Sequence, residues 1–506
     1  MAPAATRRQL LLLLILLLIC TAPSASARAR SNSSSKRVVR QLPGFDGELP
    51  FELETGYVEV DHIAGVRLFY YFIRSERSPA EDPLLLWLTG GPGCSAFSGL
   101  VYEVGPLTFD VHGHGQGGGV PRLLYKAESW TKRSNVIFLD SPVGTGFSYA
   151  DTDAGFRTSD TIAVHQILVF LNKWFQEVHP DFLSNPLYIA GDSYSGMIVP
   201  AVTLGIANSS PKQHQPSLNL KGYLLGNPVT DHNFDAPSKI PFAHGMGLIS
   251  DQLYQAYKKS CSVNHNTQQQ SVQCTNTLDA IDEARTYVSR TYTEITFWSL
   301  TALLQALIIR ASICYLLQEY GRCSNSKTFT CLRFLQNAEL TAEYTMSRIW
   351  ANNDTVREAL GIHQVKSFCH TTQHNEMIHC IHSAMQGTVP SWQRCNLDIL
   401  YTYDIKSSVR YHLDLTTRGY RSLIYSGDHD MIIPYIGTQA WIRSLNFSVV
   451  DEWRPWFVDG QVAGYTRSYS NNLTFATVKG GGHTAPEYMP KQCLAMLARW
   501  VSGNPL

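Results

Sequence analysis

The sequence has no excess of charge of either sign: its 41 basic and 41 acidic residues cancel, and only 16% of its 506 residues are charged. A neutral chain has no electrostatic attraction for nucleic acid or for an anionic membrane surface, so we expect neither as a partner. No repeat of about 20–50 residues recurs, which excludes a solenoid or a propeller. No C-x-x-C pair occurs among the eleven cysteines, which argues against a structural zinc site.

An export signal is present at the N-terminus. Two arginines precede an apolar run over Leu10–Cys20, and Ala25–Ala27 offers a small-residue cleavage site. The run is short for a membrane anchor, so no stable membrane insertion is expected. We predict that residues 1–27 are a signal peptide and that the protein enters the secretory pathway, with an extracellular or vacuolar location. The polar stretch Ser31–Lys36 is then expected to stay disordered.

Export changes what the cysteines indicate. Ten remain once Cys20 is removed with the signal, and in an oxidising compartment they are expected to form disulfides. Five glycosylation sequons in an exported chain predict a glycoprotein. Their asparagines are Asn32, Asn208, Asn353, Asn446 and Asn472.

Short β-branched and aromatic runs alternate with helical stretches, which predicts an α/β fold with a mostly parallel central sheet. Several runs are apolar without alternation, which is typical of strands covered by helices on both faces. Apolar residues at helical spacing predict helices over Thr161–Val178 and Lys491–Val501. The predicted strands are Gly56–Asp61, Arg67–Arg74, Pro83–Leu88, Asn135–Asp140, Leu187–Ala190, Gly222–Leu225, Leu423–Ser426 and Leu473–Val478.

This pattern loosens between Phe242 and Arg394. The region holds seven of the ten remaining cysteines, clusters of histidine and irregular helical pieces. We therefore predict that residues 242–394 are a lid inserted between two parts of one core, residues 28–241 and 395–506.

A nucleophile elbow is predicted at Ser193. A buried strand runs into Gly191–Gly196, where small residues permit the strained turn that lifts a serine Oγ clear of the sheet in α/β-hydrolases. The strict G-x-S-x-G form is not met, because Ser195 stands where the second glycine is expected. The elbow alone is therefore weak evidence.

The order of further motifs strengthens this interpretation, because α/β-hydrolases place serine, acid and histidine in that order. An acidic turn after one strand carries Asp428 and Asp430, and a glycine-rich loop after another carries His483. Serine needs histidine to take its proton, and the acid orients and stabilises that histidine. We assign the triad to Ser193, Asp430 and His483. Asp430 is chosen because it lies deeper in the turn, which leaves Asp428 a structural role.

A glycine-rich loop over Trp87–Ser95 follows another buried strand. No lysine follows it as a Walker motif requires, so a phosphate-binding loop is a poor interpretation. A backbone amide of this loop, together with the amide of Tyr194, would form an oxyanion hole.

Taken together, these segments resemble the serine carboxypeptidase family over about residues 40–260 and 330–506. The resemblance implies an α/β-hydrolase fold, oxyanion donors at Gly91 and Tyr194, and a disulfide between Cys94 and Cys395. It places substrate contacts at Trp87, Thr89, Gly90 and Asp192. The matching stretches are Leu42–Val58, Trp87–Ser95, Asp140–Tyr149, Gly191–Gly196, Trp392–Asn396, the Asp430 turn and Gly480–Pro486.

Two departures from the family pattern bear on the substrate. Peptidases of the family carry Asn in place of Thr89 and Glu in place of Asp192, and these residues bind the terminal carboxylate of a peptide. Thr offers a hydroxyl instead of an amide donor, and Asp is one methylene shorter, so carboxylate recognition should weaken. The pair resembles the plant acyltransferase branch, which moves an acyl group from a 1-O-β-glucose ester to an alcohol.

We therefore expect an acyltransferase that binds a small-molecule acyl donor and acceptor. The alternative is a carboxypeptidase that releases C-terminal amino acids from a peptide at acidic pH. A catalytically silent binding or processing protein is the third hypothesis, disfavoured because the whole triad is present. No cofactor is expected in any of these cases.

Two segments fit this interpretation badly. Ile295–Leu317 is almost continuously apolar, and a buried lid helix is expected there rather than a transmembrane helix. Cys369–His382 is rich in Cys and His, but it lacks regular zinc spacing and a triad hydrolase needs no metal. No metal site is therefore expected.

A retained intron is a further interpretation of this region. In the family, Gly361–Gln364 runs straight into Gly387–Trp392, whereas here the 22 residues Val365–Gln386 intervene. Their first and last residues fit codons that begin with GT and end with AG. A second stretch that is not protein-coding in the natural transcript is expected within residues 285–325.

Overall fold

The computed structural model describes residues 34–111, 119–209, 217–261, 272–282, 342–362 and 389–506. At its centre is an eleven-stranded sheet of order β1-β2-β3-β7-β4-β9-β10-β12-β15-β14-β13. The six strands from β7 to β15 in this order are parallel, and antiparallel strands flank them on both sides. The strands are β1 (Ser34–Val39), β2 (Leu53–Asp61), β3 (Val66–Ile73), β4 (Leu84–Leu88), β7 (Asn135–Leu139), β9 (Leu187–Asp192), β10 (Leu220–Gly226), β12 (Arg421–Gly427), β13 (Val449–Val458), β14 (Gln461–Tyr469) and β15 (Leu473–Val478).

All eight predicted strands are present, as β2, β3, β4, β7, β9, β10, β12 and β15. The prediction of disorder over Ser31–Lys36 is wrong for its described part. Residues 34–36 form the first half of β1, which pairs with β2, and Ser34 Oγ donates to Glu177 Oε2 at 2.6 Å. The strands β13 and β14 were not predicted, because β13 is largely exposed and its charged residues interrupt any apolar run.

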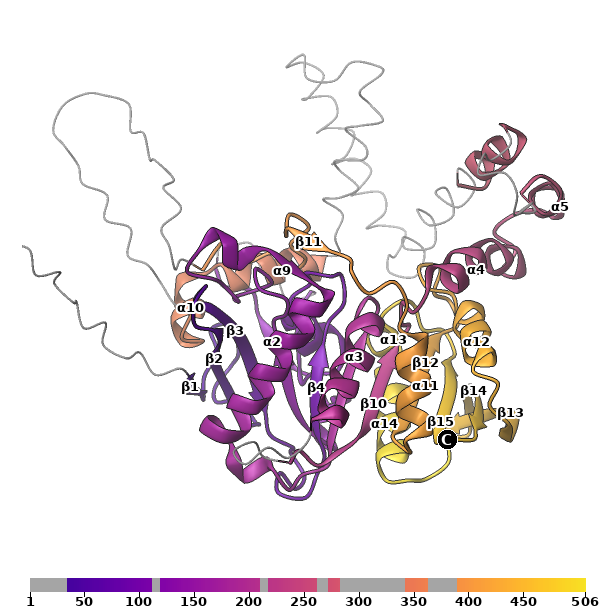
Figure 1. Cartoon of the computed structure of the whole chain (residues 1–506). Coiled ribbons are helices and arrows are strands. Elements are labelled where there is room, and N and C mark those ends of the chain that lie inside the picture. Colours follow the sequence, from indigo (N-terminus) through magenta and orange to yellow (C-terminus); the bar gives the residue numbers. More distant parts are fainter. Residues whose placement is uncertain (1–33, 112–118, 210–216, 262–271, 283–341, 363–388) are drawn as a thin grey trace, which may run out of the picture.

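Helices cover both faces of the sheet (Figure 1). The predicted helix over Thr161–Val178 is observed as α2 followed by a π-helical turn, η4, and the predicted helix over Lys491–Val501 is α14. The helices are α2 (Asp160–Lys173), α3 (Ser195–Asn208), α4 (His232–Gly245), α5 (Asp251–Ser260), α9 (Ala342–Ala351), α10 (Asp354–Ala359), α11 (Val409–Thr417), α12 (Tyr435–Ser444), α13 (Ala485–Tyr488) and α14 (Pro490–Val501), with the shorter turns η1 (Gly99–Glu103), η2 (Trp130–Lys132), η3 (Asp153–Phe156), η4 (Trp174–Val178) and η5 (Pro180–Phe182).

The strand β4 shows why its sequence is apolar without alternation. Successive side chains of a strand point to opposite faces. Leu85 and Trp87 belong to one core, which includes residues of α9 and α14, whereas Leu84 and Leu86 belong to a second core, with α2 and α3. Both faces of the strand are therefore buried, as predicted for a central parallel strand.

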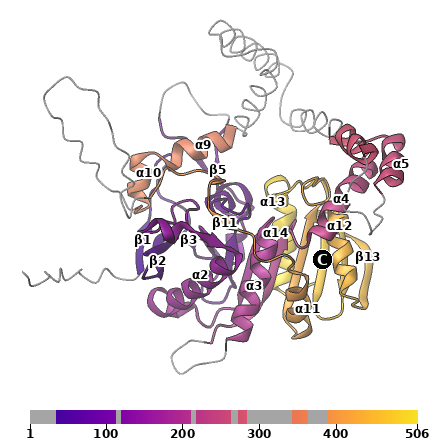
Figure 2. The ribbon, with the colours of Figure 1, turned by 45° about the horizontal axis from the view of Figure 1, so that its top comes forward.

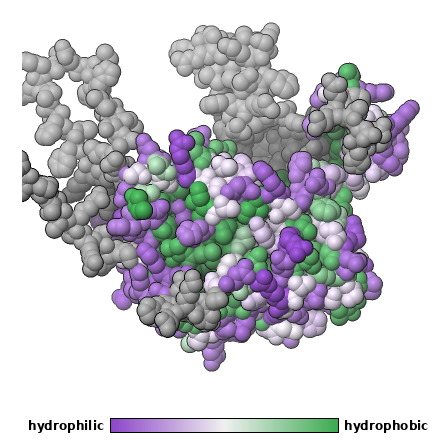
Figure 3. Space-filling view, viewed as in Figure 1, coloured by the Kyte–Doolittle hydropathy of each residue, from purple (hydrophilic) through white to green (hydrophobic). Residues whose placement is uncertain are grey.

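The helices α4 and α5 extend away from the sheet as an arm (Figures 1 and 2). A small core holds the arm to a helix over residues 272–282, and a disulfide joins Cys261 to Cys274. Where the arm is visible in Figure 3, its surface is mainly hydrophilic. Among the described residues, no helix is both long and apolar enough to cross a membrane.

Other parts of the predicted lid lie against the main core. Trp350 of α9, Val356 of α10 and Trp392 are buried in the first core. Arg357 holds both ends of the gap over 363–388: its carbonyl accepts the Ile362 N–H at 2.8 Å, and its Nη2 donates to the Val389 carbonyl at 3.2 Å. The lid boundaries themselves remain a prediction.

Several predicted segments lie outside the described residues. They are the signal peptide 1–27, Ile295–Leu317, Cys369–His382 and Val365–Gln386.

Candidate active site

The elbow at Ser193 joins β9 to α3. Ser193 has φ of 53°, a left-handed conformation that costs free energy for any residue except glycine. The turn is tight on both sides: a Cβ at Gly191 would lie 2.4 Å from the Leu88 carbonyl oxygen, and one at Gly196 would lie 2.2 Å from that of Val229. Glycines at these two positions therefore allow neighbouring carbonyl groups to pack closely against the turn that carries Ser193.

The structure brings together the three residues predicted as a triad. His483 Nε2 lies 2.7 Å from Ser193 Oγ, and His483 Nδ1 lies 2.8 Å from Asp430 Oδ2. Asp430 is 1% exposed, and its Oδ1 also accepts the N–H of Ile432 at 2.7 Å. These distances match the nucleophile–base and base–acid hydrogen bonds that triad chemistry needs.

Asn227 is a fourth member of this network that sequence reasoning missed. It follows β10, and its Nδ2 donates to Asp430 Oδ2 at 2.7 Å while its Oδ1 accepts the Gly427 N–H at 3.2 Å. Its position directly after a parallel strand was the available signal, since polar residues at these strand ends converge at one edge of the sheet.

Asp428 has a different environment. Its Oδ1 accepts the N–H of Gly480 at 2.7 Å, three residues before His483. It also lies 2.7 Å from Nδ1 of the exposed His429. Asp428 thus fastens the loop that carries His483, in keeping with the structural role expected for it.

The pKa of His483 is shifted upward. Burial alone would lower it, but the hydrogen bond and charge of Asp430, with the charge of Asp192, raise it above 6.5. A base of raised pKa takes the serine proton more readily, but it is neutral only at higher pH.

The loop that follows β4 lies directly on the elbow. A Cβ at Gly90 would come within 2.7 Å of both Ser193 Cβ and the Tyr194 amide nitrogen, so only glycine fits there. Gly91, one of the predicted oxyanion donors, has φ of 117°, which also favours glycine. The predicted loop and the predicted amide of Tyr194 are therefore adjacent in space.

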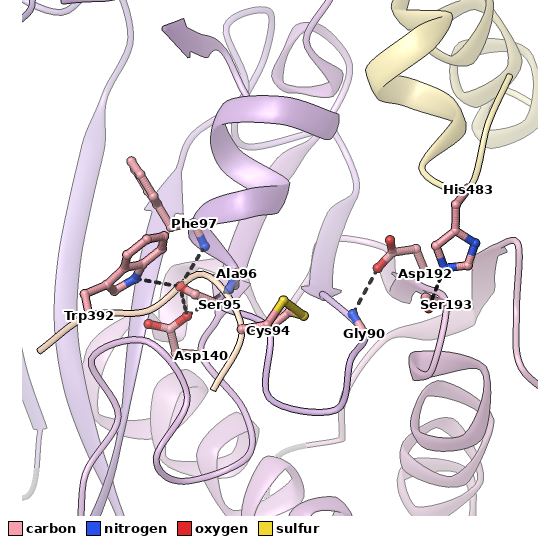
Figure 4. The surroundings of a disulfide bond; sticks show 11 residues. Gly90, Cys94, Ser95, Ala96, Phe97, Asp140, Asp192, Ser193, Trp392 and His483 are labelled. Atoms are coloured by element: carbon pink, nitrogen blue, oxygen red, sulfur yellow. Dashed lines mark hydrogen bonds between the residues drawn. A yellow bond between two sulfur atoms is a disulfide. The ribbon is translucent and has the colours of Figure 1, made fainter. Parts of the chain in front are cut away.

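A buried network holds this loop from behind (Figure 4). Asp140 accepts hydrogen bonds from Ser95 Oγ at 2.7 Å and from the Ala96 N–H at 2.8 Å, and Trp392 Nε1 donates to Ser95 Oγ at 3.1 Å. The structure joins Cys94 to Cys395 in a disulfide, as the resemblance implied. The end of the loop over Trp87–Ser95 is thus tied to the chain that follows the predicted lid.

Three buried carboxyls, those of Asp192, Glu103 and Glu487, lie close enough to influence one another near Ser193. Asp192 accepts the Gly90 N–H at 3.1 Å, and burial raises its pKa to about 6 against the opposing charge of His483 (Figure 4). Burial, followed by the charge of Asp192, raises the pKa of Glu103, whose Oε2 has no hydrogen-bond partner among the described residues. Burial also raises the pKa of Glu487. Sequence reasoning missed both glutamates, because no motif marks them.

The remaining predicted substrate contacts differ in position. Thr89 Oγ1 accepts a hydrogen bond from Trp87 Nε1 at 3.1 Å. Trp87 is only 1% exposed and packs edge-on against Trp130, so it supports Thr89 from the core and presents little surface of its own to a substrate.

Four of the five sequon asparagines are described, and Asn32 is not. Asn208, Asn446 and Asn472 are exposed, and Asn353 is half-buried as the N-cap of α10. Glycosylation at these positions remains a prediction. In the described part of the chain, no group of three or more His, Cys, Asp and Glu side chains is placed to hold a metal ion.

Comparison with known proteins agrees with this geometry. The family model "Serine carboxypeptidase" matches residues 43–503. The chain belongs to the serine carboxypeptidase family. It is 44% identical over 480 residues to serine carboxypeptidase-like 19 of Arabidopsis thaliana, covering 93% of this chain and 95% of the relative. It is 46% identical over 473 residues to serine carboxypeptidase-like 2 of the same plant, covering 93% and 94%.

Among solved structures, a prohormone-processing carboxypeptidase of Saccharomyces cerevisiae, Kex1(delta)p, superposes with a TM-score of 0.65 over 92% of this chain and 95% of its own, at 19% identity. The predicted family and the predicted α/β-hydrolase fold are confirmed, and the protein is a serine carboxypeptidase-like enzyme. The two described disulfides fit the oxidising secretory pathway.

Proposed function

We propose that this serine carboxypeptidase-like enzyme is an acyltransferase that works through an acyl-Ser193 intermediate. The observation that carries the covalent mechanism is the chain of short contacts from Ser193 Oγ through His483 to Asp430. His483 Nε2 takes the serine proton as Oγ attacks the donor carbonyl, and Asp430 stabilises the resulting imidazolium through Nδ1. The amides of Gly91 and Tyr194 bind the oxyanion.

Further proton transfers complete the acylation of Ser193 and then pass the acyl group to the acceptor. His483 first gives its proton to the leaving glucose oxygen of a 1-O-β-glucose ester, which departs as the C–O bond breaks. An alcohol acceptor then loses its proton to His483 and attacks the acyl carbonyl. The new ester leaves, and Ser193 recovers its proton.

Two residues favour transfer over peptide cleavage. Thr89 Oγ1 already accepts from Trp87 Nε1, and Asp192 Oδ1 already accepts from the Gly90 amide. Neither position supplies the amide donor and longer acid that family peptidases use for a terminal carboxylate. Without those groups, a free peptide C-terminus is expected to bind weakly.

The second candidate is a serine carboxypeptidase, and one observation favours it. Burial raises the pKa of Asp192 to about 6, so this acid is largely protonated at the pH of an acidic compartment. A protonated carboxyl can donate a hydrogen bond to a substrate carboxylate. In this case the protein would be a vacuolar peptidase.

Competition for the acyl-enzyme distinguishes the two. Water is present at about 55 M and an acceptor at about 1 mM, so the acceptor needs roughly five powers of ten, or about 6 kcal/mol, to win. An acceptor held beside His483 can gain that much, because effective molarities of oriented groups reach about 10⁵–10⁸ M.

The test supplies purified enzyme with hydroxycinnamoyl- and benzoyl-glucose esters and a pool of alcohols, and separately with blocked dipeptides at pH 4–6. We expect new esters to exceed free acid, and little amino acid to be released. Changing Thr89→Asn together with Asp192→Glu should raise peptide cleavage. Fast dipeptide cleavage by the unmodified enzyme, with no ester formed from any glucose ester, would establish the peptidase instead.

A further inference from the structure

Asp160 is a buried carboxylate that the proposed mechanism does not use. It is the first residue of α2 and is fully buried. Its Oδ1 accepts hydrogen bonds from the phenol hydroxyls of Tyr194 and Tyr401, each at 2.7 Å, and its Oδ2 accepts the Ile405 N–H at 2.8 Å. The N-terminal end of a helix favours a negative charge at this position.

These partners come from two parts of the site. Tyr194 directly follows Ser193, and Tyr401 and Ile405 belong to residues 396–405, which we call the strap because they follow the disulfide at Cys395. Within the strap, β11 (Tyr401–Thr402) pairs in parallel with β8 (Thr158–Ser159). A single carboxylate therefore connects the elbow, the strap and the start of α2.

The side chain of Tyr194 is held by its hydroxyl and by neighbouring rings. Its ring lies edge-on to those of Tyr401 and Tyr403, with centroid distances of 6.1 and 5.6 Å. A small cavity of about 20 Å³, lined by Thr89, Gly90 and both Tyr194 and Tyr401, lies next to it. The hydrogen bond to Asp160 therefore acts together with the ring contacts to hold the Tyr194 side chain beside this cavity.

The position of this side chain matters because the same residue carries a proposed oxyanion donor. Gly90 lies against the amide nitrogen of Tyr194 so closely that an added methyl group would come within 2.7 Å of it. A tilt of the Ser193–Tyr194 peptide therefore brings it against Gly90 or turns the N–H away from the oxyanion. Oxyanion stabilisation depends on donors that are in place before charge develops.

We propose that Asp160 is a positioning residue for the oxyanion hole: by holding the Tyr194 hydroxyl, it fixes the amide of Tyr194 and links it to the strap. This inference rests on the proposed roles of Ser193 and Tyr194. It requires that loss of the Asp160–Tyr194 hydrogen bond slow attack by Ser193 without changing the base, His483.

A fluorophosphonate probe tests this without a known substrate, because its phosphonyl oxygen occupies the oxyanion hole as Ser193 attacks and fluoride leaves. We expect Asp160→Asn to lower the second-order labelling rate constant by about 10- to 100-fold, since loss of a whole oxyanion donor costs about 100- to 1,000-fold. Tyr194→Phe should have a similar or smaller effect. The double variant should be no slower than Asp160→Asn alone, because both changes remove one interaction.

Thr161→Val is the matched control. It removes the hydrogen bond from Thr161 Oγ1 to Asp404 of the strap at 2.5 Å, next to Asp160 but without touching Tyr194. It should label at the parental rate. In Asp160→Asn and Tyr194→Phe the pH midpoint of labelling should stay at the parental value, because His483 is untouched.

Misfolding would lower the fraction of sites labelled, whereas mispositioning lowers the rate constant, so the two are separable. If Asp160→Asn does not fold, Tyr194→Phe carries the test. Failure of the parent enzyme to label Ser193 would refute the proposed function. Normal labelling of the parent, with parental rate constants in both Asp160→Asn and Tyr194→Phe, would refute only the positioning role.

Discussion

Two groups of buried acids lie near Ser193, one around His483 and one around Asp192, which we call the His483 side and the Asp192 side, and they differ in how completely the protein satisfies their polar groups. On the His483 side, both oxygens of Asp430 accept hydrogen bonds, from His483 and Asn227 and from the Ile432 amide. On the Asp192 side, Glu103 Oε2 has no partner among the described residues. Burying a polar group without a partner costs free energy. The described residues therefore satisfy both oxygens of Asp430 on the first side, whereas they leave one carboxyl oxygen of Glu103 without a partner on the second.

The largest effect expected on the His483 side is from Ser193→Ala. Removing the nucleophile of a triad lowers kcat by roughly six powers of ten. Fluorophosphonate labelling should disappear in this variant, as measured by mass spectrometry of the active-site peptide. Ser195→Ala, two residues further on, should label normally. Labelling of the Ser193→Ala variant at another serine would show that the nucleophile lies elsewhere.

Changing the acids separates catalytic from structural roles. Asp430→Asn should lower kcat by about 10⁴, because the amide favours the wrong histidine tautomer. Asp428→Asn should cost far less, about tenfold, because it loosens only the loop at Gly480. Steady-state kinetics of both variants measure this difference. The opposite order would assign the triad acid to Asp428.

The buried acids also predict how stability varies with pH. Burial raises the pKa values of Asp140, Asp192 and Asp235 from 3.8 to about 6. The folded state therefore binds more protons than the unfolded state between about pH 4 and 6, so stability falls as pH rises through this window. Each shift corresponds to about 1–3 kcal/mol.

Thermal unfolding at pH 4.5 and pH 7 measures this effect. We expect a higher Tm at the lower pH, and a smaller difference in Asp192→Asn. Asp46→Asn, a change at an exposed residue, serves as the control and should keep the parental difference. A parental enzyme that gains stability as pH rises from 4.5 to 7 would contradict the prediction.

The smallest effect links the two sides. The pKa of His483 is raised above 6.5, so kcat/KM should increase with pH through a midpoint above 6.5 as the imidazole becomes neutral. The charge of Asp192 contributes to this shift, so Asp192→Asn should move the midpoint to lower pH, by less than about one unit. The pH profile of kcat/KM for both enzymes tests this. An unchanged midpoint would mean that the two sides are electrostatically independent.

The residues of the site also differ in whether the sequence alone could predict them. Ser193 and His483 stand in local motifs, a glycine-flanked turn and a glycine-rich loop, and their order along the chain is typical of the fold. Asn227, Glu103 and Asp160 carry no such motif. Asn227 meets Asp430 across 203 residues of chain, and Asp160 meets Tyr401 across 241, so only the folded sheet brings them together.

The central strands were predictable for a related reason. Burial on both faces leaves a continuous apolar run, as in β4, whereas the exposed strands β1 and β13 leave none. In this protein, buried strands can be recognised from their apolar sequence, whereas exposed strands cannot.

The contacts of Arg357 with the residues before and after the 363–388 gap make the fold tolerant of length variation. The chain leaves and re-enters the core at Ile362 and Val389, and Asn352 Oδ1 accepts the Trp392 N–H at 2.7 Å a few residues later. The entropic cost of joining two fixed points by a chain grows slowly, by only about 0.6 kcal/mol for each doubling of the number of residues between them. A message that joins Gln364 directly to Gly387 would therefore encode a protein with the same two anchoring points and the same triad. Alternative splicing within this segment would change the length of the chain between Ile362 and Val389 and leave the catalytic residues where they are.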